Sequence, residues 1–182
     1  EMGKALSILK NEMVGSYCFT FISDDNSVYA ARDPKGFRPM VLGHKESDDT
    51  YIVTSESAAV TAVAAKLQRD VVPGELIKLS KNGLETEKFS DDKSRAHCSF
   101  EFTYFAHPSS MMEGHNIYVS RKNIGRFMAK KFPIKDADLV IPVPDSARPA
   151  ALGYAQELGV SFDEGLLKDR YSKKGPLRSF IE

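Results

Sequence analysis

The sequence lacks an excess of charge of either sign. Its 182 residues include 25 Lys and Arg and 25 Asp and Glu, so the formal net charge is zero. Nucleic-acid-binding proteins usually carry a basic excess, and we therefore expect no nucleic-acid partner. Long apolar runs are lacking as well, so we expect no membrane span, and no basic-then-apolar leader opens the sequence. Hydrophobic residues still make up 42% of the chain, which is enough for a folded core.

Cysteine is also scarce. The sequence has only Cys18 and Cys98, and neither belongs to a CxxC pair. This pattern argues against a disulfide framework and against a complete zinc site. We expect reduced thiols in a cytoplasmic protein, with Cys18 as a buried residue of a strand.

The first half of the chain alternates short apolar runs with turn residues, a pattern typical of β-structure. The spacing of apolar residues predicts a helix over residues 2–11, and an Ala-rich segment predicts another over 58–66. Strands are predicted at residues 17–22, 27–31, 39–43, 51–54 and 76–79. We therefore expect stacked antiparallel sheets with a few helices over residues 1–90.

The composition changes at the polar run 90–95, which is typical of a linker or a surface loop. Beyond it, helices are predicted at residues 116–132 and 149–158. Strands are predicted at residues 100–105, 138–143 and 165–167. This alternation predicts an α/β arrangement with a parallel sheet, and we place the domain boundary between residues 92 and 93.

The clearest candidate site follows the strand predicted at 138–143. A short polar loop, Asp145-Ser146-Ala147-Arg148, leads directly into a helix. The N–H groups and dipole of a helix start favour a phosphate there, and Ser146 and Arg148 can both donate hydrogen bonds to it. Asp145 could approach a phosphate-bound Mg²⁺. The alternative is that Asp145 and Ser146 only cap the helix.

A second candidate site is Lys168-Asp169-Arg170-Tyr171. Lys168 and Arg170 fall on one face of an extended segment, and they could bind phosphate near the 145–148 loop if the two strands are neighbours. The alternative is a solvated, charged loop.

A third segment, residues 32–39, contains two prolines and a glycine, which predict a rigid turn. We interpret it as structural, because no nucleophile or base is close in sequence. We expect Arg32, Asp33 and Arg38 to hold the turn as an ion-pair network.

In their order along the chain, these segments resemble the glutamine phosphoribosylpyrophosphate amidotransferase family. Three of them resemble class II glutamine amidotransferases in general: RDPKGFRP at 32–39, TSESA at 54–58 and RDVVPGE at 69–75. Three more resemble this family in particular: CSFEFTYFA at 98–106, VIPVPDSARP at 140–149 and KDRY at 168–171.

The resemblance implies part of an αββα N-terminal-nucleophile glutaminase domain in residues 1–92. It implies the first part of a type I phosphoribosyltransferase α/β domain in residues 93–182. The implied enzyme makes 5-phosphoribosylamine from glutamine and phosphoribosyl pyrophosphate, at the first step of de novo purine biosynthesis. It would use Mg²⁺, be inhibited by AMP or GMP, and form a dimer or tetramer.

The resemblance also implies roles for individual residues. Cys98 matches a position that ligates a [4Fe–4S] cluster in some members. The residues implied in binding the phosphates of substrate or nucleotide are Asp145, Ser146, Ala147, Arg148, Lys168, Arg170 and Tyr171.

The sequence departs from the family in ways that matter for activity. The family's nucleophile is an N-terminal cysteine, whereas this sequence begins Glu1-Met2-Gly3, so we expect the nucleophile upstream of these residues and the family's ribose-phosphate loop downstream of residue 182. We therefore expect no catalytic residue and no complete active site in these residues. Ala147 replaces a glycine, which could narrow the room for a phosphate. The alternatives are a non-catalytic module that binds purine nucleotides or phosphoribosyl groups, and another class II amidotransferase.

Overall fold

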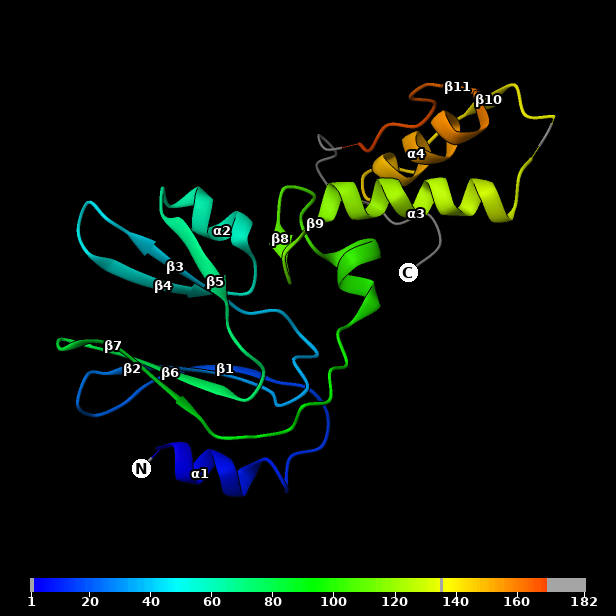
Figure 1. The fold of residues 1–182 in the computed structure, drawn as a ribbon. Coiled ribbons are helices and arrows are strands. Elements are labelled where there is room, and N and C mark those ends of the chain that lie inside the picture. The colour runs from blue at the N-terminus through cyan, green and yellow to red at the C-terminus, as the bar shows by residue number, and fades with distance from the viewer. Residues whose placement is uncertain (1, 135, 170–182) are drawn as a thin grey trace. The chain divides into compact units, whose positions relative to one another are not determined.

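The computed structural model describes residues 2–134 and 136–169 of the chain (Figure 1). The chain divides into two compact units, Glu1–Ile117 and Tyr118–Glu182. The two units are defined only by how compactly their residues pack. The domain boundary predicted between residues 92 and 93 is therefore still a prediction. Among the described residues, no helix is long and apolar enough to cross a membrane.

The first unit contains a four-stranded antiparallel sheet in the order β1-β2-β6-β7. Its strands are β1 (Cys18–Ile22), β2 (Val28–Arg32), β6 (Glu75–Ser80) and β7 (Gly83–Lys88). Ala31 pairs with Leu76 in register, so both side chains lie on the same face of the sheet. The helix α1 (Met2–Leu9) covers that face, where its Leu6 packs with Ala31 and Leu76.

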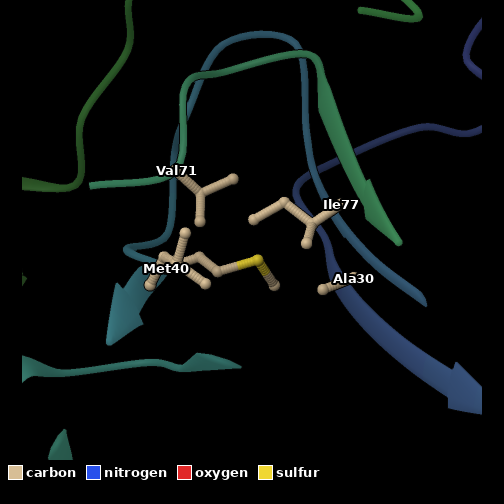
Figure 2. Packing of buried hydrophobic residues seen from close by; sticks show 5 residues of the cluster. Ala30, Met40, Val71 and Ile77 are labelled. Atoms are coloured by element: carbon tan, nitrogen blue, oxygen red, sulfur yellow. The ribbon is translucent and has the colours of Figure 1, made fainter. Parts of the chain in front are cut away.

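A second antiparallel sheet has the order β4-β3-β5. Its strands are β3 (Val41–Lys45), β4 (Thr50–Thr54) and β5 (Lys66–Asp70). The core cluster joins the two sheets, because Ala30 of β2 and Ile77 of β6 pack with Leu42 of β3 and with Met40 and Val71 (Figure 2). Burial of this cluster therefore stabilises the packing of one sheet on the other.

The helix α2 (Ser57–Ala62) covers the second sheet. Its Val60 is fully buried, and a Cβ at Gly43 of β3 would come within 2.5 Å of that side chain. The layers of the first unit are therefore helix, sheet, sheet, helix, which confirms the αββα architecture expected from the sequence (Figure 1).

Three details of the first unit differ from the prediction. The strand predicted at 39–43 begins two residues later, at Val41. The helix predicted over 58–66 ends at Ala62, and the unpredicted strand β5 follows. The strand predicted at 100–105 is wrong, because Glu101–Phe105 is a π-helical turn, η1, closed by the Ala106 N–H bonding to the Glu101 carbonyl. Two short strands follow, β8 (Met111–Met112) and β9 (His115–Asn116), which pair as a hairpin.

Arg32 stabilises the turn over residues 32–39 from inside the unit. Its side chain is 1% exposed, and it donates to the carbonyls of Arg38 (2.8 Å), Val71 (2.7 Å) and Gly36 (3.1 Å). A carboxylate oxygen of Glu113 lies 2.8 Å from the same guanidinium. Backbone carbonyls and Glu113 are therefore the partners of Arg32.

The expected ion-pair network among Arg32, Asp33 and Arg38 is therefore wrong, because each of the three side chains contacts other groups. Asp33 accepts hydrogen bonds from two backbone N–H groups of the turn, each at 3.0 Å. Arg38 pairs with Glu101 at 2.8 Å. These contacts stabilise the turn over residues 32–39, in agreement with the structural role expected for it.

The second unit contains a βαβ arrangement. Its parts are α3 (Ile117–Lys131, whose first residue belongs to the first unit), β10 (Leu139–Val140), α4 (Arg148–Leu158) and β11 (Ser161–Phe162). β10 and β11 pair in parallel, as the α/β pattern predicts. The strand predicted at 138–143 is limited to the two residues that pair with β11. The strand predicted at 165–167 is wrong, because β11 lies earlier and residues 165–167 form no strand.

Two glycines bring α3 and α4 into backbone contact. A Cβ at Gly125 of α3 would overlap the carbonyl of Ala150, and a Cβ at Gly153 of α4 would overlap the carbonyl of Lys122. Helices approach this closely only where small residues meet. The two glycines therefore set the spacing of the helix pair.

We expect Gly125→Ala to destabilise the second unit by about 1–2 kcal/mol. The gain in helix propensity is about 1 kcal/mol, but the overlap with a backbone carbonyl, which cannot rotate away, costs more. Hydrogen exchange of the α3 and α4 amides measures the change. Gly3→Ala in α1 is the matched control, because its new Cβ meets only the movable carboxylate of Glu87. Equal protection in both variants would contradict the prediction.

Candidate functional site

The loop between β10 and α4 lies where the sequence predicts a phosphate site. After β10 the chain makes a turn over residues 144–147, and α4 begins at Arg148, followed by Pro149. The loop is half-buried, with the side chains of Asp145 and Arg148 39% and 36% exposed. It is therefore open to a ligand rather than enclosed in the core.

The segment after β11 runs beside the segment after β10. The N–H of Asp163 bonds to the carbonyl of Val140 at 3.2 Å, and a Cβ at Gly165 would come within 2.9 Å of the Ile141 side chain. The carboxyl ends of neighbouring parallel strands meet at the same edge of a sheet. For this reason Lys168, which follows β11, reaches the loop that follows β10.

Four charged side chains meet at this edge. One Asp145 oxygen lies 3.1 Å from Nη1 of Arg148, and the other lies 4.0 Å from Nζ of Lys168. On its other side, Arg148 contacts Glu164, with Nε 3.0 Å from Oε1 and Nη2 3.1 Å from Oε2. The structure thus brings Asp145, Arg148 and Lys168 together, and it adds Glu164, which the sequence analysis missed.

The N-cap residue of α4 is Ala147, rather than Asp145 or Ser146. Within the described part of the chain, no side chain makes a capping hydrogen bond at the N-cap residue of α4, Ala147. Asp145 instead contacts the side chains of Arg148 and Lys168. Ser146 and Ala147 lie in the turn, and both are half-buried. Phosphate binding by these residues stays a prediction, and Arg170 and Tyr171 lie outside the described residues.

The candidate metal ligand Cys98 is buried in the first unit, where its N–H bonds to the carbonyl of Phe37 at 3.0 Å. Across residues 2–134 and 136–169, no group of three or more His, Cys, Asp or Glu side chains could hold a metal ion. The described residues therefore do not fit an iron–sulfur cluster by themselves, and ligation by Cys98 stays a prediction. A Mg²⁺ ion bound mainly to substrate oxygens and water needs only one or two protein carboxylates, which Asp145 could supply.

Cys18 lies in β1 as expected, but it is half-buried rather than buried, and its thiol is neutral near pH 7. Its Sγ lies 3.6 Å from the Pro39 carbonyl oxygen and 3.8 Å from that of Arg38. Burial is the main cause that raises the pKa of this thiol, to about 11. A thiol reacts as a nucleophile in its thiolate form, so Cys18 is poorly suited to replace a catalytic cysteine near pH 7.

The TSESA segment has a structural role that sequence reasoning missed. One Glu56 oxygen accepts the N–H of His107 at 2.7 Å and the hydroxyl of Ser110 at 2.9 Å. The Ser57 hydroxyl accepts the N–H of Met111 at 2.7 Å. These bonds fix residues 107–111 to the start of α2, a partnership that no local pattern could have revealed.

Comparisons with known proteins match this chain to one kind of enzyme, although no family model matches it. It is 43% identical over 157 residues to the amidophosphoribosyltransferase of Mycobacterium tuberculosis, covering 86% of this chain and 29% of the relative. The enzyme of Archaeoglobus fulgidus is 42% identical over 167 residues, covering 92% and 36%. That of Bacillus subtilis is 37% identical over 171 residues, covering 94% and 34%.

Solved structures agree with the sequence comparisons. A structure described as the allosteric regulatory enzyme of purine biosynthesis matches all of this chain and 37% of its own, with a TM-score of 0.88 and 35% identity. The B. subtilis glutamine phosphoribosylpyrophosphate amidotransferase, solved with ADP and GMP, matches 99% of this chain and 39% of its own, with a TM-score of 0.88 and 34% identity. The resemblance found in the sequence is confirmed, and the chain spans about a third of the length of these relatives.

We expect the raised pKa to make Cys18 slow to alkylate. At pH 8, iodoacetamide should modify Cys18 in the folded chain on the order of a hundredfold more slowly than in the urea-unfolded chain, because the thiolate is scarce. The rate should rise about tenfold per pH unit up to pH 10, since the pKa is about 11. Peptide mapping by mass spectrometry resolves Cys18 from Cys98. Similar rates in the folded and unfolded chains would show that the thiol is not desolvated.

Proposed function

We propose that this chain is a segment of an amidophosphoribosyltransferase, which makes 5-phosphoribosylamine from glutamine and phosphoribosyl pyrophosphate. The observation that carries the proposal is identity of 37–43% over 86–94% of the chain, together with a TM-score of 0.88 over its whole length. The chain would supply part of the glutaminase region and the first part of the phosphoribosyltransferase region.

We assign phosphate binding to the loop after β10 and to Lys168. The Ser146 hydroxyl and the guanidinium of Arg148 donate hydrogen bonds, and Lys168 adds a positive charge. Arg148 and Lys168 flank the two oxygens of Asp145, so a phosphate group placed there would meet both cations. Asp145 is the candidate protein ligand for a Mg²⁺ ion carried by the pyrophosphate, and such an ion would neutralise part of the pyrophosphate charge.

The reaction needs little covalent chemistry from these residues. Ammonia attacks C1 of the phosphoribosyl group, the bond from C1 to the pyrophosphate oxygen breaks, and the new amine loses a proton. The loop would hold the departing pyrophosphate and stabilise its charge. Ammonia would come from a glutaminase nucleophile in another part of the protein, because the thiol of Cys18 is neutral near pH 7.

The same residues are proposed to bind purine nucleotides. The B. subtilis relative was solved with ADP and GMP, and AMP or GMP would compete for the phosphate loop, with Arg170 and Tyr171 contributing. We further propose a cytoplasmic homo-oligomer, a dimer or a tetramer, with reduced Cys18 and Cys98.

A second candidate function is a non-catalytic module that binds purine nucleotides or phosphoribosyl groups. It is favoured by the combination of the proposed phosphate loop with a Cys18 thiol whose raised pKa, about 11, keeps the thiol neutral near pH 7. The open reading frame distinguishes the two proposals. A cysteine after the start methionine and a DDSxxxGTT-like segment downstream support the enzyme, and their absence supports the module. Another class II amidotransferase ranks lower, because it should lack the VPDS and KDRY segments present here.

We expect Ser146→Ala and Lys168→Gln each to weaken binding of phosphoribosyl pyrophosphate and AMP by roughly 10- to 100-fold. Each variant removes a hydrogen bond to a charged group, which is worth about 1.5–3 kcal/mol. Isothermal titration calorimetry on the full-length protein measures the change.

The control for these variants is Lys130→Gln, which removes the same charge from an exposed lysine on α3 that pairs with Glu157 at 3.5 Å. It should leave both affinities unchanged. Unaltered affinities in Ser146→Ala and Lys168→Gln would remove the assignment of the phosphate site.

We also expect no glutaminase activity from residues 1–182 alone. The nucleophile, the glutamine-binding residues and the oxyanion hole of this family have no counterpart in the sequence. Glutamate release can be measured with a coupled dehydrogenase assay, with the full-length protein as the positive control. Release above the rate of a buffer blank would show that a nucleophile is present in these residues.

A further inference from the structure

Glu164 is the one member of the charged group at the phosphate loop that has no role in the proposed reaction. It lies two residues after β11, and its carboxylate makes a two-point contact with Arg148. Nε and Nη2 of Arg148 both donate to Oε2, at 3.2 Å and 3.1 Å, and Nε also lies 3.0 Å from Oε1. The two hydrogen bonds share one acceptor oxygen, and together they hold the Nε and Nη2 edge of the guanidinium against the carboxylate.

The position of Arg148 explains why a partner such as Glu164 matters. It is the first residue of α4, with a side chain that is 36% exposed. A free arginine there would sample many rotamers, and a ligand that bound it would have to order the side chain at a cost in conformational entropy. The contact with Glu164 orders the side chain before any ligand arrives.

The way Arg148 is held leaves a usable face. Glu164 occupies the edge formed by Nε and Nη2, and Asp145 lies against Nη1. A guanidinium has five N–H donors. The contacts among the described residues use three of these donors, so one N–H of Nη1 and one N–H of Nη2 can still donate to a phosphate.

The same contact joins the two segments of the site. Arg148 belongs to the segment after β10, whereas Glu164 and Lys168 belong to the segment after β11. Glu164 therefore connects the loop that contains Ser146 to the segment that carries Lys168.

We propose that Glu164 is a positioning residue for phosphate binding, acting through Arg148 and without touching the ligand itself. This inference rests on the proposed function of the loop. A positioning role can be distinguished from a simple effect of charge, because the two change the affinity for phosphate in opposite directions. Removing a negative charge beside a phosphate site should tighten binding if charge alone matters, and should weaken it if Glu164 orders Arg148.

The test is Glu164→Gln in the full-length protein, with Mg²⁺ and phosphoribosyl pyrophosphate as the probe. We expect the KM and the calorimetric Kd to rise roughly three- to fivefold, the range of a partly exposed ion pair, with kcat unchanged. In an Arg148→Met background, Glu164→Gln should cause no further weakening, because the residue through which it acts is gone.

The matched control is Glu157→Gln, which removes the same charge from α4, where Glu157 pairs with Lys130 at 3.5 Å. It should leave KM and kcat as in the wild type. Thermal unfolding of each variant confirms that the comparison is made between folded proteins.

Three outcomes would overturn the inference: tighter binding in Glu164→Gln, unchanged binding, or equal weakening with and without Arg148. If Ser146→Ala and Lys168→Gln weaken binding while one of these outcomes holds, the inference alone fails. If the wild-type protein does not bind the probe, or if Ser146→Ala and Lys168→Gln bind it as the wild type does, the proposed function fails and the role of Glu164 fails with it.

Discussion

The contacts of the buried Arg32 guanidinium are the constraint on which the arrangement of the first unit depends most. Removing a charge from water costs several kcal/mol, and the cost is offset only when every side of the group finds a partner. Arg32 meets this condition with three backbone carbonyls and Glu113. Those carbonyls belong to the turn after β2 and to Val71 just beyond β5, so one side chain connects the two sheets. The turn over residues 32–39, which resembles a family motif, therefore has a structural role: it connects the two sheets.

The second unit depends on a different constraint, the close approach of backbones. Gly125 and Gly153 let α3 and α4 touch, and the parallel pairing of β10 with β11 brings the segments that follow the two strands together. The phosphate site proposed here is a product of that topology. Asp145 and Lys168 are 23 positions apart in sequence, yet they lie 4.0 Å apart because both follow neighbouring parallel strands.

The sequence was most informative where structure is local. The strands β1, β2 and β6 were predicted to within one residue of their bounds, because a short apolar run between turn residues is a local signal. β5 was missed because Lys66–Asp70 is largely polar, and its strand state comes from pairing with β3. η1 was predicted as a strand because aromatic residues favour strands, but no neighbouring strand pairs with it. Asp145, Arg148 and Lys168 could be nominated from motifs, whereas Glu164 required knowledge of which segments are neighbours.

The zero net charge argues against a nucleic-acid partner, but it is compatible with the phosphate site proposed here. Binding to a nucleic acid depends on many cations spread over a surface, so it leaves a trace in the composition. A single pyrophosphate group depends on a few donors held in fixed positions. At the loop after β10, two cations and two carboxylates balance each other. These four side chains carry no net positive charge. Their affinity for a phosphate would therefore have to come from the positions of the hydrogen-bond donors. The carboxylates that cancel the charge are then the groups that fix the geometry.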